Sequence, residues 1–124
     1  MNTQEDTMHE HRPTTKFIVH SKAVKAAGVA LSIALRVQAP LKSLAEQVIR
    51  SASSVPANLS EGAGRSGRDR IHHWRIAYAS AKEVDTHLQL LIGAGAVNAS
   101  QTETALQLFD DVRALTWRLL HPRR

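Results

Sequence analysis

Six residues from Gly62 to Gly67, Gly-Ala-Gly-Arg-Ser-Gly, have the spacing of a dinucleotide-binding loop. In such a loop the glycines follow a β-strand inside a βαβ unit, and the loop holds a pyrophosphate. The residues before Gly62 follow a helical apolar pattern, so this structural context is missing. The segment also departs from a P-loop, because Arg68 and Asp69 occupy the positions of the required Lys and Ser or Thr. We therefore expect no nucleotide cofactor.

Histidines and carboxylates could offer metal chemistry. The chain has seven histidines and no cysteine, which removes disulfides, thiolate nucleophiles and Cys-ligated zinc. His72, His73 and His87 fall on one predicted helix, but none belongs to a His-Glu-x-x-His or Glu-x-x-His pattern. The nearest arrangement, Asp85-Thr-His87, has the wrong spacing. The sequence predicts no metal site.

Ser54, Asn58 and Glu61 are the polar residues that most resemble a catalytic set. No histidine lies near them in the sequence, and there is no cysteine, so we find no activated nucleophile. We expect these side chains to be structural. The protein is predicted not to be an enzyme, with no catalytic residue and no cofactor.

The densest group of basic residues surrounds a glycine-rich turn. Its members are Arg65, Arg68, Arg70, His72 and Arg75. A helix start offers unpaired amides and partial positive charge, and glycines let a phosphate approach that backbone. We predict nucleic-acid binding here through phosphates, to which Arg123 and Arg124 at the chain end add. The competing interpretation makes Arg65 and Arg75 internal partners of Glu61 and of acidic residues on a neighbouring subunit.

The overall charge supports a polyanionic partner. The formal net charge is +5 and the sequence pI is about 10.2. Residues 1–15 hold three acidic residues and one arginine, so the rest of the chain carries the positive charge. Guanidinium groups match phosphate geometry, which favours RNA or DNA as a partner. The alternative is that the charge only keeps the protein soluble.

Apolar residues recur at steps of three and four in four segments, and no strand pattern occurs. The first helix is predicted at about 21–38, ended by Pro40, and the second at about 41–64. Ser66 with Asp69 and Ser100 with Glu103 are predicted capping boxes for the third and fourth. The predicted buried residues are Val24, Ala27, Ala30, Leu31, Ala34, Val37, Leu41, Leu44, Ala45, Val48, Ala52, Val55, Leu59, Ala63, Trp74, Ala77, Tyr78, Ala81, Val84, Leu88, Leu91, Ala105, Leu108, Phe109, Val112, Leu115 and Leu119.

These patterns predict an all-α protein, an up-down-up-down four-helix bundle over residues 16–124. Residues 1–15 are polar and without periodicity and are predicted to be a disordered leader. Pro56 lies inside the second helix and is predicted to kink it, because proline lacks the amide that would bond the carbonyl of Ala52. Asn58 and neighbouring serines are expected to bond the freed backbone groups, and Glu61 to pair with Arg65.

The second helix also carries a set of uncommon residues at fixed spacing. They are Arg50, Ala52, Ser54, Val55, Pro56, Asn58, Glu61, Gly62 and Arg65. This set resembles the signature of the 23S rRNA intervening-sequence protein family, with a weaker likeness over about residues 20–120. Ser51 departs from it, since relatives usually have arginine there, which would weaken a basic surface. Arg50, Pro56, Asn58, Glu61 and Gly62 are then expected to be structural motif residues.

The resemblance implies helical bundles that assemble into ring-like homopentamers related to retroelement accessory factors. We therefore expect a non-enzymatic, oligomeric nucleic-acid-binding protein, with each basic patch repeated around the ring. The alternative is an adaptor that docks on a protein partner such as a reverse transcriptase, without binding nucleic acid itself. No signal peptide or membrane span is evident, because the apolar run 26–35 is too short, and a cytoplasmic location is expected.

Overall fold

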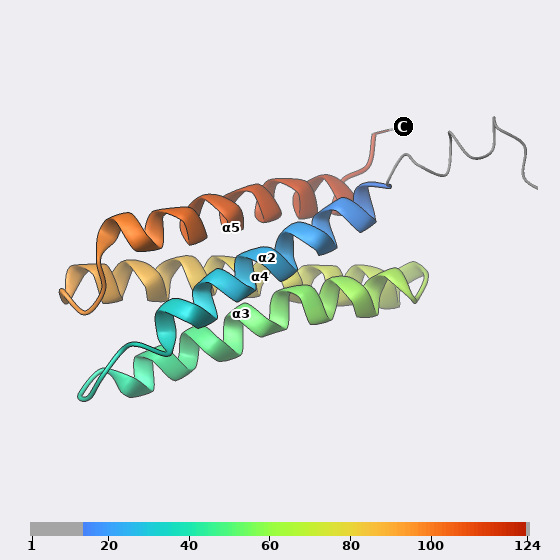
Figure 1. The fold of residues 1–124 in the computed structure, drawn as a ribbon. Helices are drawn as coiled ribbons and strands as arrows, with labels where there is room; N and C mark the ends of the chain where they lie inside the picture. The colour runs from blue at the N-terminus through green and yellow to red at the C-terminus, as the bar shows by residue number, and fades with distance from the viewer. Residues whose placement is uncertain (1–13, 124) are drawn as a thin grey trace, which may run out of the picture.

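The structure is a computed structural model and describes residues 14–123. This part of the chain forms α2 (Thr15–Ala34), α3 (Lys42–Ala63), α4 (Gly67–Gly93) and α5 (Ala99–Leu120) (Figure 1). Successive helices pack side by side and α5 returns to α2, whereas no Cα atoms of the diagonal pairs α2–α4 and α3–α5 lie within 8 Å of each other. The predicted all-α, up-down-up-down four-helix bundle is confirmed, and residues 14–123 contain no strand.

The first helix begins at Thr15, earlier than the predicted start at about Ser21. The hydroxyl of Thr14 caps it by accepting a hydrogen bond from the amide of Phe17, at 3.3 Å. That amide is one of the donors that a helix start leaves without a backbone partner. The predicted leader is therefore wrong at Thr14 and Thr15, and its residues 1–13 lie outside the described part of the chain.

The other end and the buried face of α2 also differ from prediction. The helix ends at Ala34, well before Pro40, which was expected to stop it. Val24 was assigned to the buried face, yet it is 51% exposed, while Ala23 and Ala26 are buried. Because the apolar residues of α2 are spread around the helix, with polar residues such as Lys22 and Lys25 among them, its apolar pattern does not select one face.

Pro56 lies inside α3, which continues across it without interruption, as predicted. The kink at this position stays a prediction. The side-chain amide of Asn58 donates to the carbonyl of Ser54 at 2.9 Å, and no described side chain donates to the carbonyl of Ala52. The expected repair of the Ala52 carbonyl is therefore wrong, and Asn58 has another role.

The core is built from small side chains. Ten of the 22 buried hydrophobic residues are alanines, which lets neighbouring helices approach closely. Ser80, Thr102 and Thr116 are also buried, and the two threonine hydroxyls donate to carbonyls one turn earlier in α5. Several residues predicted to be buried are only half-buried, namely Leu31, Leu41, Leu44, Ala63, Tyr78, Leu108, Leu115 and Leu119.

Neither predicted capping box forms. The side chain of Ser66 makes no capping hydrogen bond at the start of α4, and Asp69 pairs with Arg65 instead. At the start of α5 the cap is Asn98, whose Oδ1 accepts a hydrogen bond from the amide of Ser100 at 2.8 Å. Asn and Ser both serve well as caps, so residue type alone did not separate the two positions.

Candidate nucleic-acid interface

Asn58 joins α3 to α4 through a row of polar side chains. Its Nδ2 donates to the carbonyl and to Oγ of Ser54, at 2.9 and 3.1 Å, and its Oδ1 lies 2.9 Å from Nδ1 of His73. A carbonyl oxygen only accepts, so the Asn58 amide must face Ser54, and His73 must carry its proton on Nδ1. The Ser54 hydroxyl also meets that of Ser80 on α4, at 2.9 Å. This motif residue therefore links two helices.

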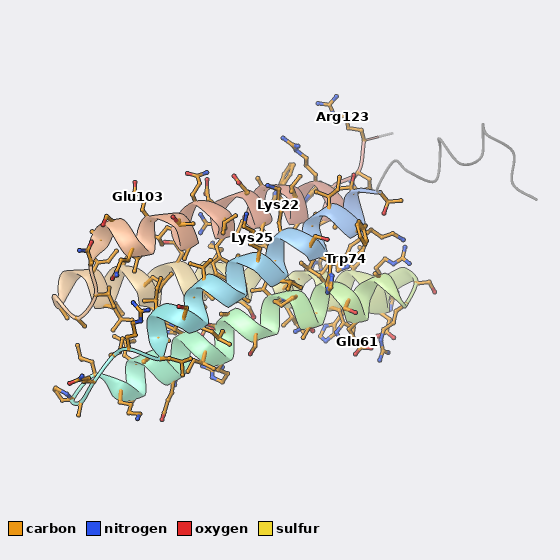
Figure 2. All side chains as sticks on the ribbon, in the orientation of Figure 1. Lys22, Lys25, Glu61, Trp74, Glu103 and Arg123 are labelled. Carbon is orange, nitrogen blue, oxygen red and sulfur yellow. The ribbon has the colours of Figure 1, made fainter. Side chains whose placement is uncertain are left out.

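Gly62 lies against the indole of Trp74. Figure 2 shows Trp74 toward the end of the bundle that holds the α3–α4 turn. A Cβ at position 62 would lie 2.5 Å from Cδ1 of Trp74, closer than real Cβ atoms come to other heavy atoms. Trp74 is buried, and its Nε1 donates to the carbonyl of Leu59 at 3.3 Å. The motif glycine is therefore required by the packing of a buried aromatic ring.

Arg70, predicted to contact phosphate, caps the end of α3. Its Nε donates to the carbonyl of Gly62 at 3.0 Å, and its Nη2 donates to the carbonyl of Ala63 at 3.1 Å. The guanidinium also lies over the ring of Trp74, 5.3 Å from the centroid. A cation at this position satisfies carbonyls that lack helical donors and opposes the negative end of the helix dipole. The hydrogen bonds of Arg70 are therefore made to the protein's own carbonyls, and its role is structural.

Arg65, also predicted to contact phosphate, lies between two carboxylates. Its guanidinium is 2.8 Å from Oδ2 of Asp69 and 3.3 Å from Oε2 of Glu61, so the predicted Glu61–Arg65 pair is confirmed. The hydrogen bond and charge of Asp69, and then those of Glu61, raise the pKa of Arg65 above its ordinary value. The hydrogen bond from Arg65 lowers the pKa of Asp69. Two nearby anions offset the charge that Arg65 would offer to a phosphate.

Arg50 makes another link between α3 and α4. Its guanidinium lies 3.2 Å from Oε2 of Glu83 and also contacts the side chain of Gln47. Such an exposed pair contributes about 0 to 1 kcal/mol. Ser51 is buried, and its hydroxyl donates to the carbonyl of Gln47 at 2.8 Å. Position 51 is thus not on the surface, so the expected weakening of a basic surface there is wrong.

The exposed face of α4 carries a row of basic residues, here named the α4 cationic stripe. It consists of Arg68, His72, Arg75 and Lys82. Helical spacing brings these residues onto one face, which Ala79 and Thr86 continue, and the nearest carboxylate to its first two members is Asp69, which pairs with Arg65. No member forms an ion pair with another residue of 14–123. At 1.5 Å per residue the stripe is about 21 Å long.

The α4 cationic stripe contains three of the five residues predicted to bind nucleic acid. Lys82 was not among the predicted residues, although it lies two helical turns after Arg75 and so falls on the same face. Lys16 and Arg118 were also not predicted to lie near each other, because they are far apart in the sequence. They border a hollow of about 390 Å³ between α2, α4 and α5, whose other lining residues are Thr15, Arg70, Trp74, Leu115, Leu119 and Pro122.

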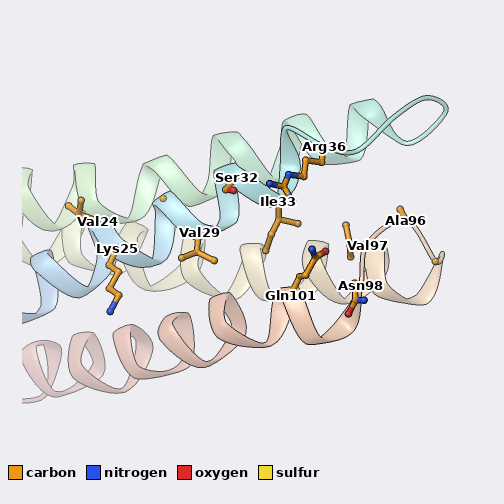
Figure 3. A pocket seen from close by; sticks show the side chains of 12 residues that line it. Val24, Lys25, Val29, Ser32, Ile33, Arg36, Ala96, Val97, Asn98 and Gln101 are labelled. Atoms are coloured by element: carbon orange, nitrogen blue, oxygen red, sulfur yellow. The ribbon is translucent and has the colours of Figure 1, made fainter.

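A groove lies at the end of the bundle that holds the α4–α5 connection (Figure 3). Its volume is about 840 Å³, and it lies between α2 and the connection that precedes α5. Most of its lining is apolar, and it continues into exposed apolar side chains of α2. The most exposed of these are Phe17, Val24 and Leu35, at 62%, 51% and 76%.

By length and composition alone, α2 could cross a membrane, with a mean hydropathy of 1.3. A core helix of a soluble protein passes the same test, and α2 packs against α3 and α5. Within residues 14–123, no group of three or more His, Asp or Glu side chains is arranged to hold a metal ion.

Together these features define a four-helix-bundle protein with a polar α3–α4 seam and a basic α4 face. The family model described as 23S rRNA-intervening sequence protein matches residues 16–118, and the chain belongs to that family. The predicted family resemblance is therefore confirmed.

A solved structure has the same fold. It is described as the crystal structure of a protein with unknown function from the S23 ribosomal protein family from Bacteroides thetaiotaomicron. The TM-score is 0.80 at 22% sequence identity, over 87% of this chain and 99% of that chain. No curated protein sequence matches this chain.

Proposed function

We propose that this protein is a non-enzymatic homo-oligomer that binds RNA or DNA through phosphate contacts. The observation that carries the proposal is the α4 cationic stripe. Its four side chains share one exposed face and lack ion-pair partners within residues 14–123. Arg65 and Arg70 are left out of this interface, because their guanidinium groups bind groups of the protein itself.

The length of the stripe suits a polyanion. One strand of B-form DNA places a phosphate about every 3.4 Å along the axis, so a stripe of about 21 Å passes several phosphates. Such contacts carry little base information, because sequence is read from the base edges. Binding should therefore depend strongly on salt and weakly on sequence.

The apolar face of α2 supports the oligomer. Phe17 and Val24 of α2 and its C-cap residue Leu35 lie at helical spacing on one face, yet the bundle leaves them largely exposed. Exposed apolar surface next to a groove marks an interaction site. We assign this site to a second copy of the chain, and the family resemblance suggests a homopentamer. A ring would repeat the stripe and increase avidity for a long polyanion.

A salt titration tests the proposal. The fluorescence anisotropy of a labelled oligonucleotide is measured with the wild-type protein at increasing salt. We expect log Kd to change linearly with log salt, at about 0.7 to 0.9 per phosphate contact. Undetectable binding at low salt to both single-stranded and duplex oligonucleotides would refute the nucleic-acid function.

A protein adaptor is the second candidate, and the apolar groove beside α2 is the observation that favours it. In this account the groove docks a protein partner such as a reverse transcriptase, and the stripe is only a solvated face. Isolation of the protein from a cytoplasmic extract, its proposed location, separates the two accounts. Nuclease treatment should release the bound material if the stripe binds nucleic acid, and should leave a docked protein in place.

A further inference from the structure

Trp117, near the end of α5, is an aromatic side chain that the bundle leaves on its surface. It is 49% exposed, whereas Trp74 is 5% exposed. The imidazole of His121 stacks on it, with ring centroids 4.1 Å apart and planes inclined by 22°. Nδ1 of His121 also lies 2.9 Å from the carbonyl of Trp117, which can only accept, so this nitrogen donates. His121 therefore supports one face of the indole.

A hollow of about 400 Å³ lies between α4 and α5, beside Trp117. Tyr78 of α4 and Trp117 of α5 both line the hollow, and His121 is not among its lining residues. The hollow therefore adjoins indole surface that His121 leaves free. Its full lining is Tyr78, Asp110, Arg113, Ala114, Trp117 and Arg118.

The charges around this hollow favour a phosphate-bearing ligand. Its one carboxylate, that of Asp110, lies 2.7 Å from the guanidinium of Arg113, which also lies 3.5 Å from Oδ2 of Asp85 and is shared between the two carboxylates. With Arg118 and Lys82 counted, three cations lie around these two carboxylates. Arg118 forms no ion pair within residues 14–123. On the other side, Lys82 of the α4 cationic stripe lies over the ring of Tyr78, 5.9 Å from the centroid. Arg118 of α5 thus lines the aromatic hollow, and Lys82 of α4 lies beside its Tyr78, and neither forms an ion pair within residues 14–123.

We propose that this hollow binds an unpaired nucleobase, stacked on Trp117, of a single strand whose phosphates contact the α4 cationic stripe and Arg118. The inference rests on the proposed nucleic-acid function and specifies single-stranded nucleic acid as its ligand. A duplex buries the faces of its bases against each other, so only an unpaired base can stack on the indole. Stacking on a protein aromatic ring tolerates every base, because each has a π-face.

Two probes test the inference, a labelled single strand of about twelve nucleotides and the duplex of the same sequence. The wild-type protein should bind the single strand more tightly than the duplex, and only the single strand should quench the fluorescence of Trp117. Trp117→Leu should weaken single-strand binding about 5- to 150-fold, the range that loss of one stacked base produces. Trp117→Phe should restore most of that affinity, and duplex affinity should not change.

Leu90→Ala is the matched control, because Leu90 is 53% exposed and lies near the far end of α4. This variant should bind both probes as the wild type does. Equal affinity of Trp117→Leu and wild type for the single strand would overturn the stacking site while leaving the phosphate contacts in place. A change of subunit number in Trp117→Leu, measured by light scattering, would make Trp117 a subunit contact and also overturn it. Failure of the wild type to bind either probe would refute both proposals.

Discussion

Five basic residues that are close in the sequence serve different purposes in the structure. Arg70 bonds the last carbonyls of α3, and Arg65 lies between Glu61 and Asp69. Arg68 and Arg75 are exposed on α4 without such partners in the described chain. The bonding of each guanidinium, rather than its position in a basic segment, decides whether its charge is available to a ligand.

The pairing of Asp69 predicts how stability depends on pH. Its pKa is lowered in the folded protein, chiefly by the hydrogen bond from Arg65. A carboxyl whose folded pKa is lower stabilises the fold above its unfolded pKa, about 3.9. That stabilisation is lost as the pH falls through the lower folded pKa. Denaturant unfolding should therefore show a wild-type advantage over Asp69→Asn at neutral pH that shrinks below about pH 3.9.

The control is Glu46→Gln, since Glu46 is exposed on α3 and forms no ion pair within residues 14–123. Its stability difference from the wild type should change less across the same pH range. If the difference between the wild type and Asp69→Asn were constant with pH, the role of the Arg65 pair would be wrong.

At the scale of the helices, the motif residues hold α3 against α4. Asn58 bonds His73, Arg50 pairs with Glu83, and Gly62 makes room for Trp74. The uncommon residue types in α3 therefore have physical reasons that lie on α4. Pro56 is the exception, because no contact in the structure explains it.

Gly62→Ala tests the close approach of α3 and α4. The added Cβ would meet the buried ring of Trp74 and lies only 3.1 Å from the carbonyl of Arg70. We expect a loss of about 1 to 3 kcal/mol in the free energy of unfolding, the usual result of overpacking. Gly93→Ala is the control, because a Cβ there meets nothing within 4 Å. Equal denaturant midpoints for the two variants would contradict this packing account.

Helical periodicity and the α3 motif were sufficient to predict the four helices and the family. The start of α2 was missed because the apolar residues that follow its cap, Phe17, Ile18 and Val19, are consecutive and do not recur at helical spacing. The start of α5 was misplaced because Asn98 and Ser100 can both cap a helix. Part of the candidate site was likewise predicted, in Arg68, His72 and Arg75. The structural role of Arg70 was not predicted, nor was the pairing of Arg65 with Asp69. Both depend on how the α3–α4 turn positions their partners, the carbonyls of Gly62 and Ala63 and the side chain of Asp69.

At the scale of the whole molecule, the polar and apolar surfaces are separated. Basic residues follow the outer face of α4, while exposed apolar residues follow α2, and no Cα atoms of these two helices lie within 8 Å of each other. A bundle of this kind can associate through α2 while α4 stays accessible. The two surfaces can therefore be tested independently.

Val24→Glu should disrupt the oligomer, because it places a charge in the apolar surface beside the groove. Light scattering should give a mass that is a multiple of 13.6 kDa for the wild type and a smaller mass for the variant. Leu90→Glu, which alters an equally exposed residue on α4, should keep the wild-type mass. Circular dichroism should show unchanged helix content in both. A wild-type protein that stays at 13.6 kDa at tens of micromolar would refute the oligomer.

The central claim is that the α4 cationic stripe binds phosphate, and the most direct measurement compares salt dependence between two charge variants. Arg75→Gln removes one cation from the stripe, and Lys42→Gln removes one exposed cation from the start of α3. The stripe variant should bind a single-stranded oligonucleotide more weakly, with a log-log salt slope smaller by about one per lost contact. The control should keep the wild-type slope. Identical slopes and affinities for the two variants would contradict the account.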